Sequence, residues 1–429
     1  MTCVMEIDTH GKVVKSDIGP AVIRVKRRCN YVEVRKALVD GIIPDDLQPF
    51  MPMLRDLQEL STILKNMRLR RGAIDFDFPE YKVILDPEGV PLRLEKRERT
   101  LAEQIVEESM LIANETVSCY LRDSDNPSVY RIHEIPEPER LDMMRTVLSS
   151  FNLPVPDSEH VKPADFQKLL ETTKGTDEAA VVQTIALRSM QQARYATANA
   201  GHFGLASECY THFTSPIRRY PDMMVHRLLA RYLEGGKSAD RDTFEKLCVH
   251  ASEREVIAAE AERASIKYKM VEFMQDKIGQ FFDGHISGMS DWGMYVELDE
   301  THIEGMVSLR EMEDDLYQFD ENRYEVYGRR KGRIFTLGDA VRIRVKRADL
   351  QRRQLDFDFV RTRLVCAGCR LRWPCGLLCL VCSMYRRAAR WFPEHTVRAI
   401  RISSRTGLLW FHAPEPVFHC SSSSRAMNI

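Results

Sequence analysis

Short runs of alternating apolar and polar residues dominate the first thirty positions. The runs CVMEI and KVV lie on either side of a THG turn, and AVIRV follows at 21–25. Alternation with a period of two is typical of half-buried antiparallel strands. The pattern therefore predicts a small sheet, and because it begins almost at Met1 the sheet would have an open edge. We interpret this as a chain that enters within a domain.

From Tyr31 to about Tyr268 the apolar positions recur mostly at helical spacing. They predict helices in LAEQIVEESMLIANETVSCYL (101–121), DFQKLLETT, AVVQTIALRSMQQARYA and MMVHRLLARYL, and a long charged helix from Thr243 to Gln275. Short strands are predicted at AIDFDF (73–78) and YKVIL (81–85). Helices interleaved with strands predict an α/β (α+β) domain over about residues 1–270, incomplete at its N-terminus.

Residues 277–360 have a different pattern. Short alternating strands are punctuated by glycines, a turn-rich insert follows, and GDAVRIRVKRADLQRRQLDFDFV closes the segment. Five short strands with a helical break predict a Greek-key barrel of the OB-fold type.

Composition changes again after position 360. Residues 361–429 contain arginine but neither lysine nor aspartate, and six of the eleven cysteines fall there. No periodic signal of useful length is present, so we expect this tail to be disordered or translated outside its normal frame. Two C-x-x-C pairs, Cys366 with Cys369 and Cys379 with Cys382, have spacing that could hold zinc. The apolar sequence between them argues against a zinc site.

Bulk charge and hydropathy narrow the function classes. The net charge is −1, so any affinity for nucleic acid must come from local patches. Apolar runs are shorter than a membrane span needs, and the N-terminus has no signal-peptide pattern. We expect a cytoplasmic protein with reduced cysteines.

The segment THFTSPIRRYPD places Arg218 and Arg219 just before the apolar run MMVHRLLARYL. Ser215 and Pro216 fit an N-cap and first-turn pair, and Pro221 is predicted to start the main helix. Cations are disfavoured at a helix N-terminus unless an anion is also present. A bound phosphate would make both arginines favourable. The alternative is that both pair with acidic side chains in the core.

The longer segment GHFGLASECYTHFTSPIRRYPDMMVHRLL resembles the signature of the RNase II/RNase R family of 3′-to-5′ exoribonucleases. VEESMLIAN (106–114), RIHEIPEPERL (131–141) and LRSMQQARY (187–195) resemble the family in the same order, and residues 277–360 resemble its S1-type RNA-binding barrel. The resemblance implies processive hydrolysis of single-stranded RNA that releases nucleoside 5′-monophosphates. It covers about residues 1–360.

The resemblance also implies roles for individual residues. Arg218 matches the residue that contacts the scissile phosphate, with Arg219 beside it as a further RNA contact. Tyr31 falls where a tyrosine stacks on a base near the 3′ end, and Glu107 where a glutamate holds the terminal nucleotide, in preference to Glu108. Without the resemblance, Tyr31 would be an ordinary half-buried aromatic and Glu107 part of a solvated helix face.

In the barrel, aromatic and cationic side chains are the candidates for RNA contact. Phe282 and Tyr295 lie in segments that resemble the RNA-facing strands, and His302 and Lys346 are further candidates. About half of the barrel aromatics, Phe281 among them, are expected to fill the interior instead.

Metal ligands are the main departure from the family. Two-metal hydrolysis of a phosphodiester needs converging carboxylates that hold Mg²⁺. The family's closely spaced aspartates lie upstream of the segment that resembles Met1 onward. The pairs in this chain lack that spacing; they are Asp45 with Asp46, Asp75 with Asp77, Asp123 with Asp125, and Asp314 with Asp315. The chain alone is therefore expected to be inactive unless an upstream fragment supplies the metal site. The alternative function is a non-catalytic RNA-binding protein.

Overall fold

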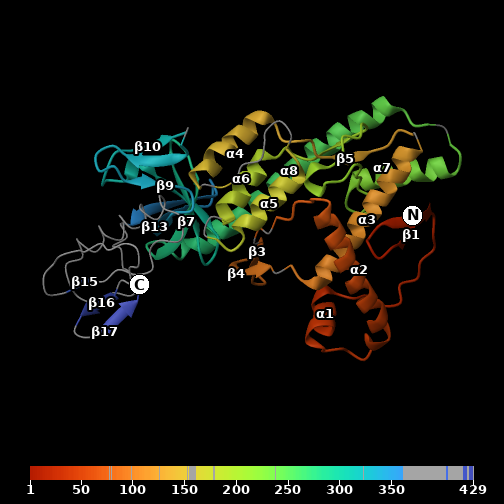
Figure 1. Cartoon of the computed structure of the whole chain (residues 1–429), viewed down its shortest axis with the longest axis horizontal. Helices are drawn as coiled ribbons and strands as arrows, with labels where there is room; N and C mark the ends of the chain where they lie inside the picture. Colours follow the sequence, from red (N-terminus) through yellow and green to blue (C-terminus); the bar gives the residue numbers. More distant parts are fainter. Residues whose placement is uncertain are drawn as a thin grey trace. The chain divides into compact units, whose positions relative to one another are not determined.

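The computed structural model describes two compact units, residues 1–360 and 361–429 (Figure 1). Within the first, it describes all residues except 77, 79, 98, 125, 152, 154–160, 177–178, 237 and 322. In the second, it describes strands β15 (Ile402–Ser403), β16 (His419–Ser422) and β17 (Arg425–Asn428), which form one sheet. The two C-x-x-C pairs, where the sequence argued against zinc, lie outside the described residues, as does most of the tail.

The N-terminal strand pair is confirmed, but its predicted third segment is not a strand. β1 (Thr2–Ile7) pairs antiparallel with β2 (Val13–Gly19) around the predicted turn. Residues 21–25 have no regular structure, and Val22, Ile23 and Val25 are highly exposed. Alternation gives a segment the side-chain pattern of a strand, but a strand also needs a neighbour to receive its hydrogen bonds. None of the described residues pairs with this segment.

Helices form most of the rest of residues 31–275. They are α1 (Tyr31–Arg35), a π-helical turn (Lys36–Asp40), a 3₁₀ turn (Gln48–Phe50), α2 (Met51–Arg70), α3 (Leu101–Asp123), α4 (Pro138–Ser150), α5 (Pro163–Thr173), α6 (Ala179–Ser189), a second 3₁₀ turn (Phe203–Leu205), α7 (Tyr220–Leu233) and α8 (Arg241–Gln275). The helices predicted from apolar spacing are confirmed, although the one predicted through Ala196 ends at Ser189. Arg194–Ala196 forms strand β6 instead, paired with β5 (Tyr130–Ile132).

One strand predicted in this region is confirmed and one is not. β3 (Glu80–Leu85) contains the predicted YKVIL and pairs with β4 (Pro91–Arg97). Residues 73–76 and 78 form no strand. Ile74 donates its backbone N–H to the carbonyl oxygen of Gly204 at 2.9 Å, so a loop rather than a sheet satisfies this backbone. No helix among the described residues has the length and apolar content needed to cross a membrane.

The predicted five-stranded barrel is confirmed. Its closed order is β13 (Ala340–Asp349), β14 (Gln354–Val360), β9 (Glu304–Ser308), β8 (Gly293–Leu298) and β7 (Phe281–Met289). A 3₁₀ turn (Leu309–Glu311) supplies the helical break, and the insert forms a separate sheet of β10 (Tyr317–Asp320), β11 (Glu325–Gly328) and β12 (Ile334–Phe335).

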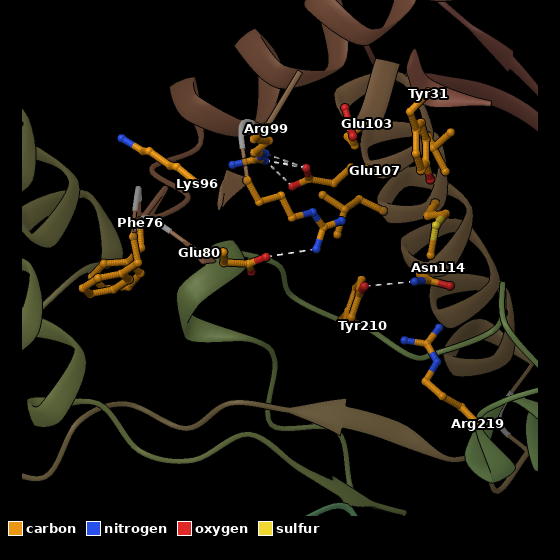
Figure 2. Close-up of a pocket in the computed structure, with 15 residues that line it drawn as sticks. Tyr31, Phe76, Glu80, Lys96, Arg99, Glu103, Glu107, Asn114, Tyr210 and Arg219 are labelled. Atoms are coloured by element: carbon orange, nitrogen blue, oxygen red, sulfur yellow. Dashed lines mark hydrogen bonds and ion pairs between the residues drawn. The ribbon is translucent and has the colours of Figure 1, made fainter. Parts of the chain in front are cut away.

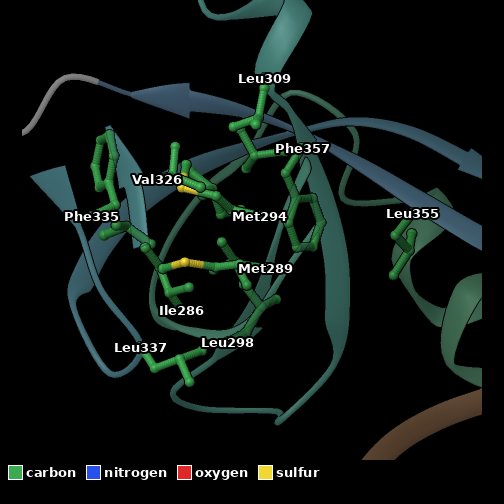
Figure 3. Packing of buried hydrophobic residues seen from close by; sticks show 14 of the residues in the cluster. Ile286, Met289, Met294, Leu298, Leu309, Val326, Phe335, Leu337, Leu355 and Phe357 are labelled. Carbon is green, nitrogen blue, oxygen red and sulfur yellow. The ribbon is translucent and has the colours of Figure 1, made fainter. Parts of the chain in front are cut away.

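Aliphatic side chains and Phe357 fill the barrel interior (Figure 3). A Cβ atom on Gly305 would lie 2.5 Å from the ring of Phe357, so only glycine fits at this crossing. Val271 and Met274 of α8 belong to the same buried cluster. The barrel is thus packed on the end of the long helix rather than attached by a free linker.

Candidate functional site

A cleft of about 800 Å³ lies between α3, the β3–β4 hairpin and the start of α7 (Figure 2). Segments that are far apart in the sequence contribute its walls. The lining residues are Tyr31, Phe76, Phe78, Glu80, Lys96, Arg97, Arg99, Glu103, Val106, Glu107, Met110, Leu111, Asn114, Tyr210 and Arg219. Four of them are cationic and three carry carboxylates, so the side chains have a small positive excess. The cleft also offers aromatic rings, which suits a ligand with both anionic groups and flat bases.

Helix α3 provides one wall. Thr100 and Glu103 form a capping box that fixes where the helix begins. Glu103, Glu107 and Asn114 then follow at helical spacing and all face the cleft. Glu108, one position along, points into the core.

The buried partner of Glu108 is Arg68 of α2. Arg68 Nη2 lies 2.9 Å from Glu108 Oε1, and both side chains are at most 5% exposed. Of the two adjacent glutamates, the structure therefore gives Glu107 access to the cleft and Glu108 a structural ion pair.

Glu107 is not free in the cleft. Arg99 contacts the Glu107 carboxylate with two of its nitrogens, and its Nε donates to Oε2 at 3.0 Å. Nη1 of Arg99 also donates to Asp75 Oδ1 at 3.2 Å. Across the cleft, Arg97 donates to Glu80 at 3.0 Å. These ion pairs are partly exposed and worth little individually. An entering anion could therefore exchange for them at low cost.

Asn114 connects α3 to the segment before the arginine turn. Its Nδ2 donates to the hydroxyl of Tyr210 at 2.9 Å, and its Oδ1 accepts the backbone N–H of Phe213 at 2.9 Å. Asn114 is only 1% exposed, so this polar group is buried and fully used. It places the Tyr210 ring at the floor of the cleft.

The two arginines of the turn have different surroundings. The backbone N–H groups of Arg218 and Arg219 both donate to the carbonyl oxygen of Ser215, which forms a turn before α7 rather than the start of that helix. Arg219 is the N-cap residue of α7, which begins at Tyr220 just before Pro221 as predicted. Arg219 lines the cleft. Arg218 is exposed and is not among the residues that line this cleft.

Asp222 is the acceptor for this turn. Its Oδ1 receives the backbone N–H of Ser215 at 2.7 Å and Nη2 of Arg219 at 2.9 Å. Arg219 therefore does pair with a core carboxylate, as the alternative interpretation anticipated, and it also lines the cleft. Its buried Nε has no hydrogen-bond partner among the described residues.

Behind the turn lies a cluster of buried rings. His212 shares a hydrogen bond with the hydroxyl of Tyr195 at 2.8 Å, and the His202 and His212 rings pack edge-on against Tyr210. Burial, together with the charge of Arg219, lowers the pKa of His212 to about 2. Burial likewise lowers the pKa of His202 to about 3. Both rings are therefore neutral at pH 7 and support the cationic turn without adding charge.

Three sequence-predicted residues thus meet in one cleft: Tyr31, Glu107 and Arg219. Sequence reasoning missed Arg99, Asn114 and Tyr210. Asn114 had a detectable signal, because it lies seven positions after Glu107 on the same helical face and interrupts an apolar run. The sequence carried no such signal for Arg99 and Tyr210, because only the tertiary structure brings these two residues close to the Glu107 face of α3.

Two neighbouring barrel aromatics, Phe281 and Phe282, differ from expectation. Phe281 is 53% exposed, so the prediction that it fills the interior is wrong. Phe282 packs against the barrel core instead. Adjacent strand residues face opposite sides, so only one of the two can be interior. Tyr295 is half-buried, beside Gly288 on the neighbouring strand.

The two polar barrel candidates already have protein partners. His302 stacks on Tyr81 of β3 with ring centroids 4.5 Å apart, and its Nδ1 contacts Glu297. Lys346 pairs with Glu311 at 3.0 Å and with Asp358 at 3.6 Å. RNA would have to compete with these contacts.

The carboxylates present do not fit a pair of magnesium ions. No group of three or more His, Cys, Asp or Glu side chains that could hold a metal occurs among the described residues. Asp46 pairs with Arg27, Asp75 with Arg99 and Asp123 with Arg122, while Asp315 accepts the backbone N–H groups of residues 316, 330 and 331. Asp77 and Asp125 lie outside the described residues.

Comparison with known proteins agrees with the fold. The family model for the RNB domain matches residues 1–235, and that for the S1 RNA binding domain matches residues 275–358. Ribonuclease R of Thermotoga maritima is 40% identical over 368 residues, which is 84% of this chain and 52% of that protein. Ribonuclease R of Escherichia coli is 33% identical over 373 residues, which is 84% of this chain and 46% of that protein.

A solved structure of an RNase R has a similar fold. The apo form of Mycoplasma genitalium RNase R superposes with a TM-score of 0.80 at 25% identity, covering 83% of this chain and 57% of that one. The chain spans about half the length of the curated relatives it matches. An RNB-type α/β domain followed by an S1-type barrel places this chain in the RNase II/RNase R family of exoribonucleases.

Proposed function

We propose that residues 1–360 form the RNA-holding part of an RNase R-like enzyme that hydrolyses single-stranded RNA processively from its 3′ end, releasing nucleoside 5′-monophosphates. The single observation that carries this proposal is the convergence of Tyr31, Glu107 and Arg219 in one cleft. A solved relative, Mycoplasma genitalium RNase R, has been captured in complex with ribose methylated single-stranded RNA, which supports the same ligand class here.

In this proposal each lining group meets one part of a nucleotide. The Arg219 guanidinium lies at the N-terminus of α7, where backbone N–H groups and the helix dipole also favour a phosphate. The exposed ring of Tyr31 stacks on a base near the 3′ end, and Phe76 with Phe78, already stacked at 5.6 Å, offers a second platform. Glu107 accepts ribose hydroxyls after it separates from Arg99. Arg218, exposed without RNA, is proposed to contact the scissile phosphate in the complex.

The barrel is proposed to guide the single strand toward the cleft. Phe281 and Tyr295 provide rings, and Lys346 provides a cation. Since Phe281 is the exposed member of its pair, it is the better stacking platform of the two phenylalanines. Affinity should fall as salt rises, because cationic groups that contact phosphates release counterions.

Hydrolysis itself is proposed to need carboxylates from outside residues 1–360. Those at the cleft are engaged with arginines or a helix cap, so they do not form a two-metal site. Three apolar residues are exposed in the segment between β2 and α1, shortly before Tyr31 in the sequence; they are Val22, Ile23 and Val25. We propose this apolar segment as the place where a metal-bearing upstream segment packs. The same engaged carboxylates favour the second candidate function, a non-catalytic RNA-binding protein.

Binding and cleavage can be measured separately with the full chain. A short single-stranded oligoribonucleotide labelled at its 5′ end serves for both titration and a degradation ladder. We expect binding that weakens on Arg219→Ala, and no ladder with Mg²⁺. The matched control is Arg188→Ala, at an exposed arginine on α6 that is not among the residues lining this cleft, and this variant should bind as the parent does.

Two results would count against parts of this proposal, and a third would favour the enzyme over the binding-only alternative. Equal affinity of Arg219→Ala and the parent would remove the cleft assignment. A Mg²⁺-dependent ladder from the 3′ end that is abolished by Arg218→Ala would show that this chain is catalytically sufficient without an added segment. Restoration of the ladder by adding a separately expressed upstream segment would support the enzyme over the binding-only alternative.

A further inference from the structure

Two cysteines distant in sequence meet beside the cleft. Sγ of Cys119, on α3, lies 2.7 Å from Sγ of Cys209, in the segment that leads to the arginine turn, and the two residues are 90 positions apart. Both are free thiols, as are Cys3, Cys29 and Cys248. Of these five described cysteines, Cys119 and Cys209 are the two whose sulfur atoms contact each other.

The pair can be reached from one side. Cys119 lines a hollow of about 530 Å³ between β2 and α3, which Val13, Thr116 and Tyr120 also line. Cys209 is 1% exposed and lies behind Cys119. A small oxidant would therefore meet Cys119 first, while Cys209 is already in position to react with the product.

We propose that Cys119 and Cys209 form a reversible disulfide, with a peroxide as the oxidant, and that this bond ties α3 to the segment carrying Tyr210. The electrostatics support the chemistry. The hydrogen bond with the Cys119 thiol, aided by the charge of Arg122, lowers the pKa of Cys209 to about 7 against the opposing effect of burial. The same hydrogen bond, together with burial, raises the pKa of the Cys119 thiol. The shared proton therefore rests on Cys119 and passes to Cys209 across the sulfur-to-sulfur contact when Cys119 reacts.

The reaction balances with hydrogen peroxide alone. The Cys119 thiolate attacks one peroxide oxygen, the O–O bond breaks, and the departing hydroxide takes the proton of Cys209 to form water. The Cys209 thiolate then attacks the sulfur of the Cys119 sulfenic acid. The S–O bond breaks, and the hydroxide that leaves takes a proton from solvent. Two thiols and one peroxide thus give a disulfide and two waters.

The bond would join two walls of the cleft. Cys209 directly precedes Tyr210, which lines the cleft. Cys119 lies on α3, the helix whose residues Asn114 and Glu107 also line it. Fixing these walls together reduces the ordering needed when RNA binds, so oxidation should tighten binding by about threefold. This consequence for RNA rests on the proposed function, whereas formation of the disulfide does not.

Peptide mapping of the oxidised full chain tests the bond directly. The protein is treated with hydrogen peroxide, quenched with catalase, alkylated under denaturing conditions and digested without reductant. We expect a cross-linked peptide containing Cys119 and Cys209 that dithiothreitol abolishes. The urea midpoint should also rise on oxidation, since the bond closes a long loop in the unfolded chain. Cys119→Ser should lose both responses, and Cys29→Ser, at an exposed cysteine, should keep both.

Recovery of Cys119 and Cys209 as alkylated thiols, after a treatment that oxidises Cys29, would overturn the disulfide in the parent protein without relying on any variant. A cross-link that forms while RNA affinity stays constant would overturn the regulatory part alone. The cleft assignment would then still be judged by Arg219→Ala, so the two failures are distinguishable.

Discussion

Nη2 of Arg219 lies 2.9 Å from Oδ1 of Asp222, across the first turn of α7. Asp222 is fully buried, and the same oxygen receives the backbone N–H of Ser215. One carboxylate therefore holds both the arginine that lines the cleft and the turn that presents it. The pair also explains how a cation is tolerated at a helix N-terminus without RNA, because the buried anion offsets the unfavourable helix dipole.

Removing that carboxylate should affect both stability and binding. Asp222→Ala leaves Arg219 and the Ser215 N–H without their acceptor, so we expect a loss of about 3 kcal/mol in unfolding free energy. RNA affinity should fall with it. Asp222→Asn keeps an oxygen acceptor and should lose less of each. Urea unfolding and oligonucleotide titration measure the two effects, and unchanged affinity in Asp222→Ala would contradict the positioning role.

The buried pair of Arg68 and Glu108 should be costly to break on one side. Arg68→Met leaves the Glu108 carboxylate in the core without its partner, and we expect a loss of about 3–5 kcal/mol. The double variant Arg68→Met with Glu108→Leu should recover most of that loss. The exposed pair of Arg93 and Glu95 is the control, where Arg93→Met should cost less than about 1 kcal/mol. Similar losses at both pairs in urea unfolding would refute the distinction.

Stability should fall as the pH drops below about 6.5, the ordinary pKa of histidine. His212 is held neutral in the folded protein, where burial and then Arg219 lower its pKa to about 2. Between these two values the unfolded chain binds a proton at this site that the folded chain does not. Each pH unit in that window therefore costs about 1.4 kcal/mol for this group.

Substitution identifies the residue responsible. His212→Asn keeps a polar group near Tyr195 but cannot titrate. The unfolding free energy measured from about pH 6.5 down to about pH 5, in the upper part of that window, should therefore vary less steeply than in the parent. Equal slopes would show that His212 is not the source of the acid sensitivity.

The two adjacent phenylalanines of β7 should respond differently to alanine. Phe281 is 53% exposed, so Phe281→Ala should change stability by less than about 0.5 kcal/mol while weakening RNA binding. Phe282 packs against the barrel core, so Phe282→Ala should cost about 2 kcal/mol or more. Thermal unfolding together with RNA titration separates the two, and the reverse order would mean that the strand faces are assigned wrongly.

The sequence predicted correctly those helices and strands that are specified by patterns within their own residues. The apolar spacing of residues 101–121, the Thr100 capping box and the glycine-punctuated strands of the barrel each specify their own structure. Where a segment needed a distant partner, the pattern was insufficient. Residues 21–25 and 73–76 have the composition of strands, but none of the described residues pairs with them as a sheet.

The sequence by itself determined that this chain carries helices, a five-stranded barrel and a signature segment with two arginines. It could not decide which arginine faces the cleft, or that Arg99, Asn114 and Tyr210 join Glu107 there. Those outcomes depend on the packing of segments separated by up to about two hundred residues, and packing also decides which side of a strand or turn is buried. Adjacent residues such as Glu107 and Glu108, or Arg218 and Arg219, are chemically identical in the sequence. Only the tertiary structure gives one of each pair a core partner or a place in the cleft.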